Sequence, residues 1–536
     1  MKKFIFLNLE FPINYNSPHI LEVLSPSLGQ LSLAAALRNV GYNCYFIDLS
    51  LLKIFKKTIW DKLSKIRGFE FIGISAHTVQ YNRMMEIANQ IKETYNDIKI
   101  LAGGPHPSLL PKSVLLRDSP IDYVIINEGE KSLPLFLDEL KYKERNFKTE
   151  GIAWRNKGEV YINKVKPIMD LDSIPIPAYD LVPLQKYYEL FCKYSKIYGY
   201  KNISFRIPLE ASRGCPGNCN FCCARLILHN KFRNKSPKRI IEEIEFLYNR
   251  FPSIIKKNNV GISFVDNNFT TNKKMVKEFC RLKNERGFDI KWAVLSRATD
   301  LKGDLVKKMS KSNLSGIYIG GESGDIEGLK AMNKGYRGPN DTIKAVNMCL
   351  KYSIKNIVIS FFIGAPWEKY NNIVKTLWFA YNLYKLSPNH IQIIIYKFIP
   401  YPKTDLWDKI NINKSNYSEI DFKSYDLGLK DRFVFDHKFL NSKEVDRLQN
   451  LFNSLIIIEK IFYYYKMNPL AKNKPNNLIK SLFWILNKNT EIDLILKDLL
   501  YCRKDILHNT LEKLKNLIFE EFKRYNQQIE VQVRSN

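Results

Sequence analysis

Three cysteines in one short stretch constrain this chain more than any other feature of its sequence. Residues 213–222 read RGCPGNCNFC, so three and then two residues separate the thiols of Cys215, Cys219 and Cys222. Thiolates are soft ligands that suit zinc or iron-sulfur clusters, and these three can converge on one centre only if the loop wraps around it. The two glycines of the stretch favour such a loop, because glycine adopts the backbone angles that a tight turn requires.

The number of ligands separates two kinds of metal site. A closed structural zinc site takes four protein ligands, whereas a cluster held by three thiolates leaves one iron open to another molecule. A fourth zinc ligand is hard to find, because Cys223 directly follows Cys222 and no Cys-x2-Cys or His-x3-His pattern follows within zinc-finger range. The spacing also argues against three ordinary buried thiols.

The cysteine stretch follows an apolar strand predicted at residues 203–209, and this combination resembles the signature of radical S-adenosylmethionine enzymes. In that family three cysteines hold a 4Fe-4S cluster, and the fourth iron binds the amino and carboxylate groups of S-adenosylmethionine. The resemblance implies that Cys215, Cys219 and Cys222 are the cluster ligands. Cys223 is expected to be structural.

Length and composition predict a globular protein of two or three domains. A chain of 536 residues exceeds a single core, and 45% of its residues are hydrophobic. Nine cysteines, mostly scattered, do not form a disulfide framework and fit a reducing compartment. Asn8 and Glu10 interrupt the apolar start, which predicts a strand rather than a signal peptide, and no apolar run approaches the roughly 18 residues of a membrane span. We therefore expect a cytoplasmic protein without a transmembrane segment.

The net charge of +29 predicts attraction to polyanions such as nucleic acid, an anionic membrane surface or a phosphorylated substrate. No basic run marks a nucleic-acid tail and no RNA-binding motif accompanies the charge, so nucleic acid is not the expected partner. We expect a small-molecule or lipid substrate, with the charge favouring an anionic one. The family resemblance also implies an electron donor such as flavodoxin or ferredoxin.

Residues 1–145 alternate apolar strands with amphipathic helices. Strands are predicted at residues 3–8, 43–48, 69–75, 98–102 and 122–126, and helices at 28–40, 79–95 and 131–142. This alternation predicts a doubly wound parallel sheet, Rossmann-like or flavodoxin-like, with its ligand at the carboxyl ends of the strands.

The loops after these strands resemble the cobalamin-binding domain that precedes the radical module in one large subclass, above all through the GGPH of residues 103–106 and the EGE of residues 128–130. The Asp-x-His-x2-Gly motif that supplies a cobalt ligand in other cobalamin domains is absent, so cobalamin would bind without a histidine below the metal. A purely structural domain of the same fold is the alternative. The resemblance implies a set of cobalamin-binding residues in these loops: Leu28, Gly29, Ser75, Gly103, Gly104, His106, Glu128 and Gly129.

Residues 146–200 are predicted to connect two domains. Residues 151–162 look like a small hairpin, and Pro167, Pro175, Pro177 and Pro183 then predict an extended path without strands.

Residues 201–424 show a second alternation. Strands are predicted at residues 203–209, 261–265, 291–294, 316–319, 356–362 and 391–398, with helices at 237–248, 273–286, 342–352 and 371–384. Six such repeats predict a partial (β/α)6 barrel of the TIM type, with an active site at the C-terminal ends of its strands.

The polar loops after these strands also resemble the radical family module, which must supply partners for the carboxylate, amine, ribose and ring of S-adenosylmethionine. The resemblance places Asp266 and Asn268 near the methionine end of this molecule, Arg297 at its carboxylate or ribose, and Glu322 with Ser323 at its ribose or amine. The loop after the second strand departs from the Gly-Gly-Glu that is usual in the wider superfamily. The sequence identifies no catalytic acid or base.

Residues 425–536 are predicted to be helical and to cap the barrel. Ser442 can cap a helix that ends before Pro469, and a further helix is predicted at residues 509–525. The aromatic residues 463–465 and 483–484 could line a substrate pocket or pack in a core. Cys502 is the only cysteine of this region, which argues against a second cluster.

The resemblance implies a cobalamin-dependent radical S-adenosylmethionine enzyme. The reduced cluster would cleave S-adenosylmethionine to a 5′-deoxyadenosyl radical, and methylcobalamin would then methylate an unactivated carbon. A cyclase, oxidase or rearrangement enzyme without methyl transfer is the alternative within the family. A methylthio-transferring RNA enzyme would need three more cysteines upstream, where only Cys44 and Cys192 occur. A non-catalytic zinc or cluster protein that holds nucleic acid is the alternative from another class.

Overall fold

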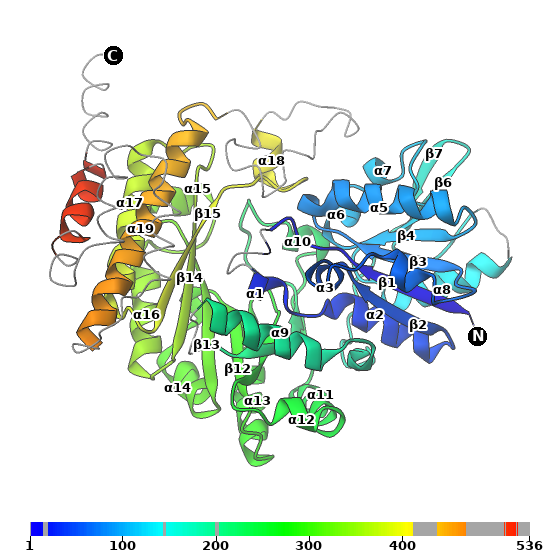
Figure 1. Cartoon of the computed structure of the whole chain (residues 1–536), viewed down its shortest axis with the longest axis horizontal. Helices are drawn as coiled ribbons and strands as arrows, with labels where there is room; N and C mark the ends of the chain where they lie inside the picture. The colour runs from blue at the N-terminus through cyan, green and yellow to red at the C-terminus, as the bar shows by residue number, and fades with distance from the viewer. Residues whose placement is uncertain are drawn as a thin grey trace. The chain divides into compact units, whose positions relative to one another are not determined.

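The computed structural model describes residues 2–13, 15, 20–142, 146–198, 203–410, 437–467, 509, 511–520 and 522–523. The chain divides into two compact units, of which the first comprises Met1–Val294 with Pro400–Leu429 and the second Leu295–Ile399 with Lys430–Asn536. Figure 1 shows the elements along the chain. The predicted domain boundaries at residues 145, 200 and 424 lie outside the described residues and stay a prediction.

A seven-stranded sheet in the first unit has the order β2-β1-β3-β4-β5-β6-β7. Its parallel strands are β1 (Lys3–Asn8), β2 (Asn43–Asp48), β3 (Phe71–Ser75), β4 (Lys99–Gly103) and β5 (Tyr123–Ile125). The helices α2 (Leu28–Asn39) and α5 (Tyr81–Thr94) lie between these strands in the chain, and α8 (Gly129–Glu139) follows β5 (Figure 1). The predicted doubly wound sheet is confirmed. From β1 the chain first adds β2 on one side and then β3, β4 and β5 on the other, so the topological switch point lies between the carboxyl ends of β1 and β3.

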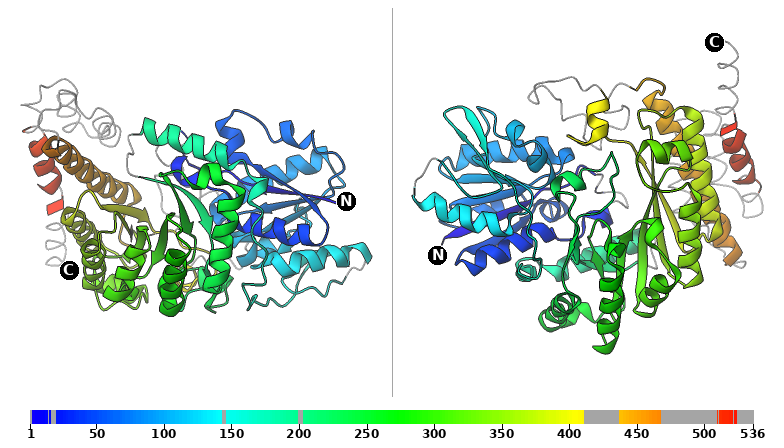
Figure 2. Two further views of the ribbon diagram at one scale, coloured as in Figure 1. Left: turned by 90° about the horizontal axis from the view of Figure 1, so that it is seen from below. Right: turned by 180° about the vertical axis from the view of Figure 1, so that it is seen from behind.

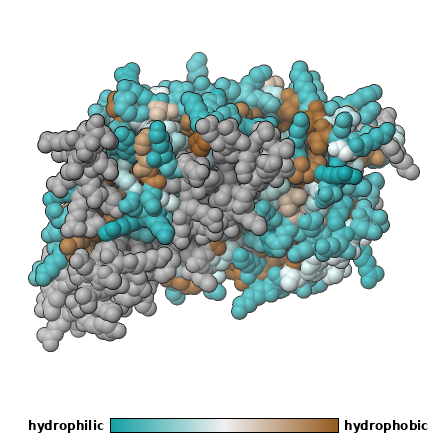
Figure 3. Space-filling model, turned by 90° about the horizontal axis from the view of Figure 1, so that it is seen from above, coloured by the Kyte–Doolittle hydropathy of each residue, from teal (hydrophilic) through white to brown (hydrophobic). Residues whose placement is uncertain are grey.

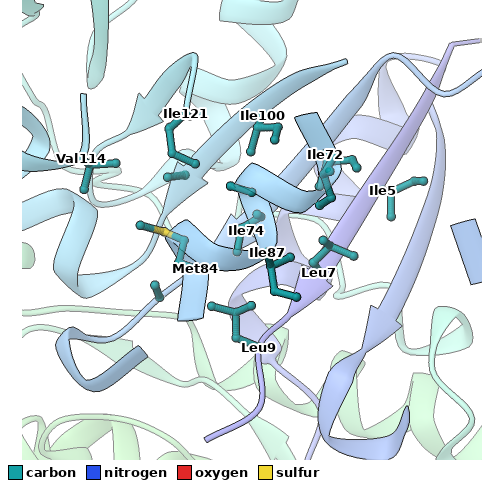
Figure 4. Packing of buried hydrophobic residues seen from close by; sticks show 14 of the residues in the cluster. Ile5, Leu7, Leu9, Ile72, Ile74, Met84, Ile87, Ile100, Val114 and Ile121 are labelled. Carbon is teal, nitrogen blue, oxygen red and sulfur yellow. The ribbon is translucent and has the colours of Figure 1, made fainter. Parts of the chain in front are cut away.

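Alternating side chains of the strands build two cores, one on each face of this sheet. Ile5 and Leu7 belong to one buried cluster, whereas Phe4 and Phe6 belong to the other. This separation follows because successive residues of a strand point to opposite faces. Figure 4 shows the first cluster, in which residues of three strands meet residues of α5; the labelled members include Ile5, Leu7, Ile72, Ile74, Ile100, Met84 and Ile87.

The predicted hairpin forms, as β6 (Ile152–Asn156) and β7 (Glu159–Ile162). β6 pairs antiparallel with β5, so the hairpin extends the N-terminal sheet. Helix α9 (Leu184–Ile197) follows and was not predicted. Its buried residues Leu184, Tyr187, Leu190 and Phe191 have the spacing of an amphipathic helix, but the prolines before it favoured an extended path.

A second sheet has the order β15-β14-β13-β12-β11-β8. Its strands are β8 (Phe205–Leu209), β11 (Val260–Phe264), β12 (Lys291–Ser296), β13 (Leu314–Glu322), β14 (Asn356–Ile363) and β15 (Ile391–Lys397). The registered pairs β8 with β11, β11 with β12, β13 with β14, and β14 with β15 are parallel. The main helices between the strands are α11 (Pro237–Arg250), α13 (Lys273–Glu285), α14 (Gly303–Lys311), α16 (Asn340–Lys351) and α17 (Tyr370–Leu386). The predicted six-stranded architecture is confirmed, and α14 is a helix that the sequence did not predict.

Helix α19 (Ser442–Met467) begins at the predicted capping residue and packs against α17, as Figures 1 and 2 show. Its residues Val445, Leu448, Phe452 and Leu455 are buried, as the helical spacing predicted. A later helical stretch is described at residues 511–520. The side chains of residues 463–465, the pair 483–484 and Cys502 lie outside the described residues.

The described residues contain no helix that is long and apolar enough to cross a membrane. In the space-filling view of Figure 3, hydrophilic side chains cover most of the coloured surface, and hydrophobic atoms appear between them in small areas.

Candidate functional site

The stretch with the three cysteines forms a closed loop. Its base is a two-stranded ribbon in which Arg213 of β9 (Ser212–Arg213) lies opposite Arg233 of β10 (Arg233–Asn234). Residues 214–232 between these strands are called the cluster loop below. Gly214 has a φ angle of +87°, and a Cβ atom there would lie 2.2 Å from the carbonyl oxygen of Lys231. Only glycine fits at this entry into the loop.

The three thiols are partly buried and free of disulfides. The backbone N–H of Gly217 donates to Cys215 Sγ over 3.4 Å, and the N–H of Cys222 donates to the carbonyl of Cys219 over 3.2 Å. Burial raises the pKa of Cys222 to about 12, so this thiol needs a nearby cation to ionise at neutral pH.

No three His, Cys, Asp or Glu side chains of the described residues gather closely enough to hold a single metal ion. In a 4Fe-4S cluster each cysteine binds a different iron, so the ligands need not meet at one point. Three thiols without disulfides on one wrapped loop are a donor set that fits such a cluster.

The carboxylate of Asp266, which follows β11, contacts the segment that leads into the cluster loop. It accepts hydrogen bonds from Ala211 N over 3.2 Å and from Ser212 Oγ over 2.5 Å. Burial raises the pKa of Asp266 to about 7, although these two hydrogen bonds lower it. The structure therefore engages this carboxyl group in positioning the loop.

Asn268 is fully buried and orders its own turn. Its amide nitrogen donates to Thr271 Oγ1 over 2.8 Å, and its amide oxygen accepts from Thr270 Oγ1 over 3.2 Å. These bonds fix the chain between β11 and α13.

Arg297 and Glu322 of the second unit converge on a third residue, Lys334. Lys334 Nζ donates to Glu322 Oε1 over 2.5 Å, and Arg297 Nη2 donates to the carbonyl of Lys334 over 2.5 Å. Tyr336 lies beside them, because its ring centroid is 5.9 Å from the Arg297 guanidinium and 5.2 Å from Lys334 Nζ. Glu322 has a φ angle of +64°, which costs energy for a residue other than glycine and is common at functional sites.

Ser323 is fully buried beside these residues. Its hydroxyl lies 3.2 Å from Thr376 Oγ1 and accepts from the N–H of Asp325 over 3.1 Å. Sequence reasoning missed Lys334 and Tyr336 as neighbours of Arg297 and Glu322.

A cavity opens at the carboxyl ends of β1 and β3, at the switch point of the N-terminal sheet. Among the described residues that line it, none carries a carboxylate, ammonium or guanidinium group. The lining instead offers hydroxyl, amide and imidazole groups. This switch-point cavity is lined by Asn8, Phe11, Val23, Ser25, Ser27, Ser50, Ser75, His77 and Gln80.

Of the predicted residues in this domain, Ser75 lines the cavity, and Gly104 packs against Ser75. Gly104 has a φ angle of +87°, and a Cβ atom there would lie 2.5 Å from Ser75 Oγ. Gly103 ends β4, while Leu28 and Gly29 begin α2 directly after Ser27 of the lining. Sequence reasoning missed most of the lining, because its residues come from separate loops that only the fold brings together.

His106 is fully buried and is not one of the described lining residues. Its Nδ1 lies 3.3 Å from Thr78 Oγ1, its ring packs on Tyr81 with centroids 4.6 Å apart, and burial lowers its pKa to about 3. Glu128 also points elsewhere, because its carboxylate accepts from Ile168 N over 2.6 Å and from Arg233 over 2.9 Å. Gly129 begins α8, where a Cβ atom would lie 2.8 Å from a methyl carbon of Leu33.

Comparison with known families matches both parts of this architecture. The family described as "B12 binding domain" matches residues 21–137, and the family described as "Radical SAM superfamily" matches residues 209–380. The first match includes β2 to β5 and most of the lining of the switch-point cavity, and the second begins just before the cluster loop.

Individual proteins agree with these matches. An uncharacterized methyltransferase of Pyrococcus horikoshii is 31% identical over 362 residues, which are 66% of this chain and 73% of that protein. An anaerobic magnesium-protoporphyrin IX monomethyl ester cyclase of Synechocystis is 24% identical over 62% of this chain and 63% of its own. The solved cobalamin-dependent S-adenosylmethionine radical enzyme OxsB covers 100% of this chain and 80% of its own, with a TM-score of 0.68 and 18% identity. At that identity the similarity to OxsB concerns the fold.

Proposed function

Because the chain belongs to the radical S-adenosylmethionine enzymes that carry a B12-binding domain, we propose that it methylates an unactivated carbon of a small-molecule or lipid substrate. Membership implies a 4Fe-4S cluster, S-adenosylmethionine, cobalamin and a reductant. The observation that carries the methylation proposal is the 31% identity to a protein named as a methyltransferase, extending over most of that protein.

We assign Cys215, Cys219 and Cys222 as the cluster ligands. When bound, the cluster supplies the electron that cleaves S-adenosylmethionine to methionine and a 5′-deoxyadenosyl radical. The protein's part is to hold the loop closed through the β9–β10 ribbon and Gly214, and to anchor its entry through Asp266. A loop fixed in this way presents three thiols to the cluster, so one iron would stay open to S-adenosylmethionine.

We divide the predicted S-adenosylmethionine residues into two groups by their burial. Arg297 and Glu322 are partly exposed and charged, so they are assigned to direct contact with S-adenosylmethionine. Arg297 would bind its carboxylate or ribose, and Glu322 its ribose or amine. The side chains of Asp266, Asn268 and Ser323 are buried and hydrogen-bonded to other protein groups, so they are assigned to positioning. Asp266 holds the segment that leads into the cluster loop, whereas Asn268 and Ser323 bond residues of their own turns.

We assign the switch-point cavity to cobalamin. The corrin ring carries many neutral amide groups on its periphery, which match the hydroxyl and amide groups of Ser25, Ser27, Ser75 and Gln80. When bound, cobalamin supplies the methyl group. Gly103 and Gly104 would let the backbone approach the ring edge closely, and Leu28 with Gly29 would contact it from the start of α2.

In this proposal the remaining predicted residues of this domain do not contact cobalamin but support the loops around the cavity. Gly129 allows α8 to begin against Leu33, His106 orders the loop after β4, and Glu128 binds the base of the cluster loop.

The test follows the methyl group itself. Protein reconstituted anaerobically with iron, sulfide and cobalamin is reduced and incubated with methyl-labelled S-adenosylmethionine, and the label on cobalamin is measured. We expect labelled methylcobalamin, and we then expect label to enter one compound in an extract of a strain that lacks the gene. Binding of cobalamin without any transfer of label would contradict methylation.

A cyclase is the second candidate, because the chain is 24% identical to the Synechocystis cyclase over 337 residues. The product distinguishes the two. Methylation adds one labelled methyl group to the product, whereas ring closure removes hydrogens and leaves the label on methionine, on unreacted S-adenosylmethionine or on cobalamin.

A further inference from the structure

Buried charges connect the loop between β5 and α8 to the base of the cluster loop, both within the first compact unit. Glu128 of this loop and Glu130 in the first turn of α8 bind two arginines of the β9–β10 ribbon. The ion-pair network, as it is called below, consists of Glu128, Glu130, Glu210, Arg213 and Arg233.

Arg213 is the centre of the first half of the network. Its side chain is 9% exposed; Nη2 donates to Glu130 Oε1 over 2.6 Å and Nε donates to Glu210 Oε2 over 2.9 Å. Burial by itself raises the pKa of Glu130, but the Arg213 guanidinium and Ser32 outweigh it and hold this pKa below its usual value. Both partners are therefore charged, and the planar guanidinium fixes their geometry.

Arg233 is the centre of the second half. Its side chain is 3% exposed; Nη2 lies 2.8 Å from Glu128 Oε1 and Nη1 donates to Glu128 Oε2 over 2.9 Å. The same Nη1 donates to the carbonyl of Ile168 over 2.6 Å. One arginine thus fastens one glutamate and a backbone carbonyl to the second strand of the ribbon.

A third contact reaches the loop itself. Asn127, directly before Glu128, has its amide nitrogen 3.0 Å from Nε2 of His229, which lies in the cluster loop near Arg233. The three successive contacts all come from residues 127–130, which follow β5 at the carboxyl edge of the N-terminal sheet.

The register of the β9–β10 ribbon shows that these contacts hold both strands at the base of the cluster loop. Arg213 and Arg233 are paired directly across β9 and β10, and Arg213 precedes Cys215 by two residues. Each strand of the loop's base is therefore held by one glutamate of the neighbouring domain. Removing one partner would leave a buried charge unpaired and would release one side of the base.

We propose that Glu128 and Glu130 are positioning residues that fix the cluster loop relative to the carboxyl edge of the N-terminal sheet. This inference rests on the proposed function, in which that edge holds cobalamin and the loop holds the cluster. The network would then set the distance between the bound cluster and the bound cobalt atom. This distance would determine how much 5′-deoxyadenosine forms for each methyl group transferred.

The test compares Glu130→Gln with a matched control. Glu243→Gln disrupts a similarly buried ion pair, since Glu243 Oε1 lies 2.6 Å from Lys235 Nζ with side chains 1% and 4% exposed. Both residues of this pair lie within the radical SAM match, so the pair does not reach the N-terminal sheet. The first readout needs no bound group, because it is the rate at which iodoacetamide alkylates Cys215, Cys219 and Cys222 in the apoprotein. We expect iodoacetamide to alkylate these cysteines several-fold faster in Glu130→Gln than in either the wild type or the control.

The second readout is the electron paramagnetic resonance spectrum of protein that holds a reduced cluster and cob(II)alamin together. We expect Glu130→Gln to keep both groups but to change their magnetic interaction, and to form several-fold more 5′-deoxyadenosine per methyl group transferred. Glu130→Asp should restore part of both properties, because it keeps the charge. If Glu130→Gln does not fold, Arg213→Lys takes its place, since it keeps the charge and loses the planar fork.

Two results separate the failures. Wild-type alkylation rates and an unchanged magnetic interaction in a folded variant would overturn the positioning role alone. Wild-type protein that holds a cluster but no cobalamin would overturn the proposed function, and the alkylation rates would still decide whether the network fixes the loop.

Discussion

The cluster loop and the switch-point cavity belong to the same compact unit, yet they are built in opposite ways. The loop takes its three thiols from eight consecutive residues, and charged side chains such as Arg213 and Glu130 hold its base. The cavity takes its neutral lining from the last residues of β1 and β3, from residues that follow β1, β2 and β3, and from the segment before α2. A contiguous motif can be recognised in sequence, whereas a site assembled by topology needs the fold.

The difference extends to what each region can tolerate. Three ligands on one loop share a single task, so the loss of any of them should remove the bound group entirely. A neutral lining distributes its contacts over many residues, and each hydrogen bond contributes about 1 kcal/mol. The two regions should therefore respond to mutation with very different magnitudes.

The largest expected effect comes from the cysteines. Cys219→Ala should remove nearly all cluster iron and all 5′-deoxyadenosine formation, but it should leave cobalamin binding unchanged because the cavity shares no residue with the loop. Iron analysis and chromatography of the nucleoside measure the two losses. Cys223→Ala is the control, and a loss of iron of the same size there would show that Cys223 is a ligand.

The next effect concerns Gly104. Gly104→Ala places a methyl group 2.5 Å from Ser75 Oγ in addition to the strain of a positive φ, so it should destabilise the protein and weaken cobalamin binding. Gly158→Ala is a matched control, because Gly158 has a φ of +85° with nothing within 4 Å of the added carbon. The control should lose about 1–2 kcal/mol of unfolding free energy, from backbone strain alone. Equal losses in both variants, with cobalamin binding intact, would contradict the close packing at the cavity.

A smaller effect should appear as a pH dependence at Asp266. Burial raises the pKa of this group to about 7 in the folded protein, above its unfolded value, so the folded state holds the proton more tightly. The contribution of Asp266 to stability is then largest at low pH and falls as the pH rises through about 7. Asp266→Asn should gain stability relative to the wild type between pH 5 and pH 7 by less than about 3 kcal/mol. Denaturant unfolding at both pH values measures this, and a parallel response of the two proteins would contradict it.

The smallest expected effect is that of one cavity hydroxyl. Ser75→Ala should weaken cobalamin binding by about 1 kcal/mol, roughly fivefold, and should leave the iron content unchanged. Equilibrium dialysis with hydroxocobalamin measures the affinity, and Ser310→Ala in the second unit serves as the control. Complete loss of cobalamin from Ser75→Ala would mean that the cavity depends on a single contact, as the cluster loop does.

The sequence predicts those parts of this structure that repeat or lie close together in the chain. The strands at residues 3–8 and 43–48 agree with the structure to the residue, because apolar runs between turn signals are local. Helix α9 was missed because the prolines before Leu184 suggested that the extended path continues. The ion-pair network could not be predicted, since Glu130 and Arg213 are 83 residues apart and charged residues are usually solvated.

The candidate S-adenosylmethionine residues show the same limit. Glu322 was identified from its loop, but its partner Lys334 became evident only when the fold brought the two within 2.5 Å. Asp266, Asn268 and Ser323 were chosen as polar loop residues, and only the structure shows that each is buried and hydrogen-bonded to other protein groups. Residue type and position after a strand predict where a site lies, but they do not tell direct contacts from supporting ones.

The most direct test of the account is the amount of 5′-deoxyadenosine that the wild-type chain forms after anaerobic reconstitution with iron and sulfide and reduction in the presence of S-adenosylmethionine. We predict brown protein with about four irons per chain and steady formation of the nucleoside. Colourless protein that binds one zinc ion and forms no 5′-deoxyadenosine would contradict the central claim.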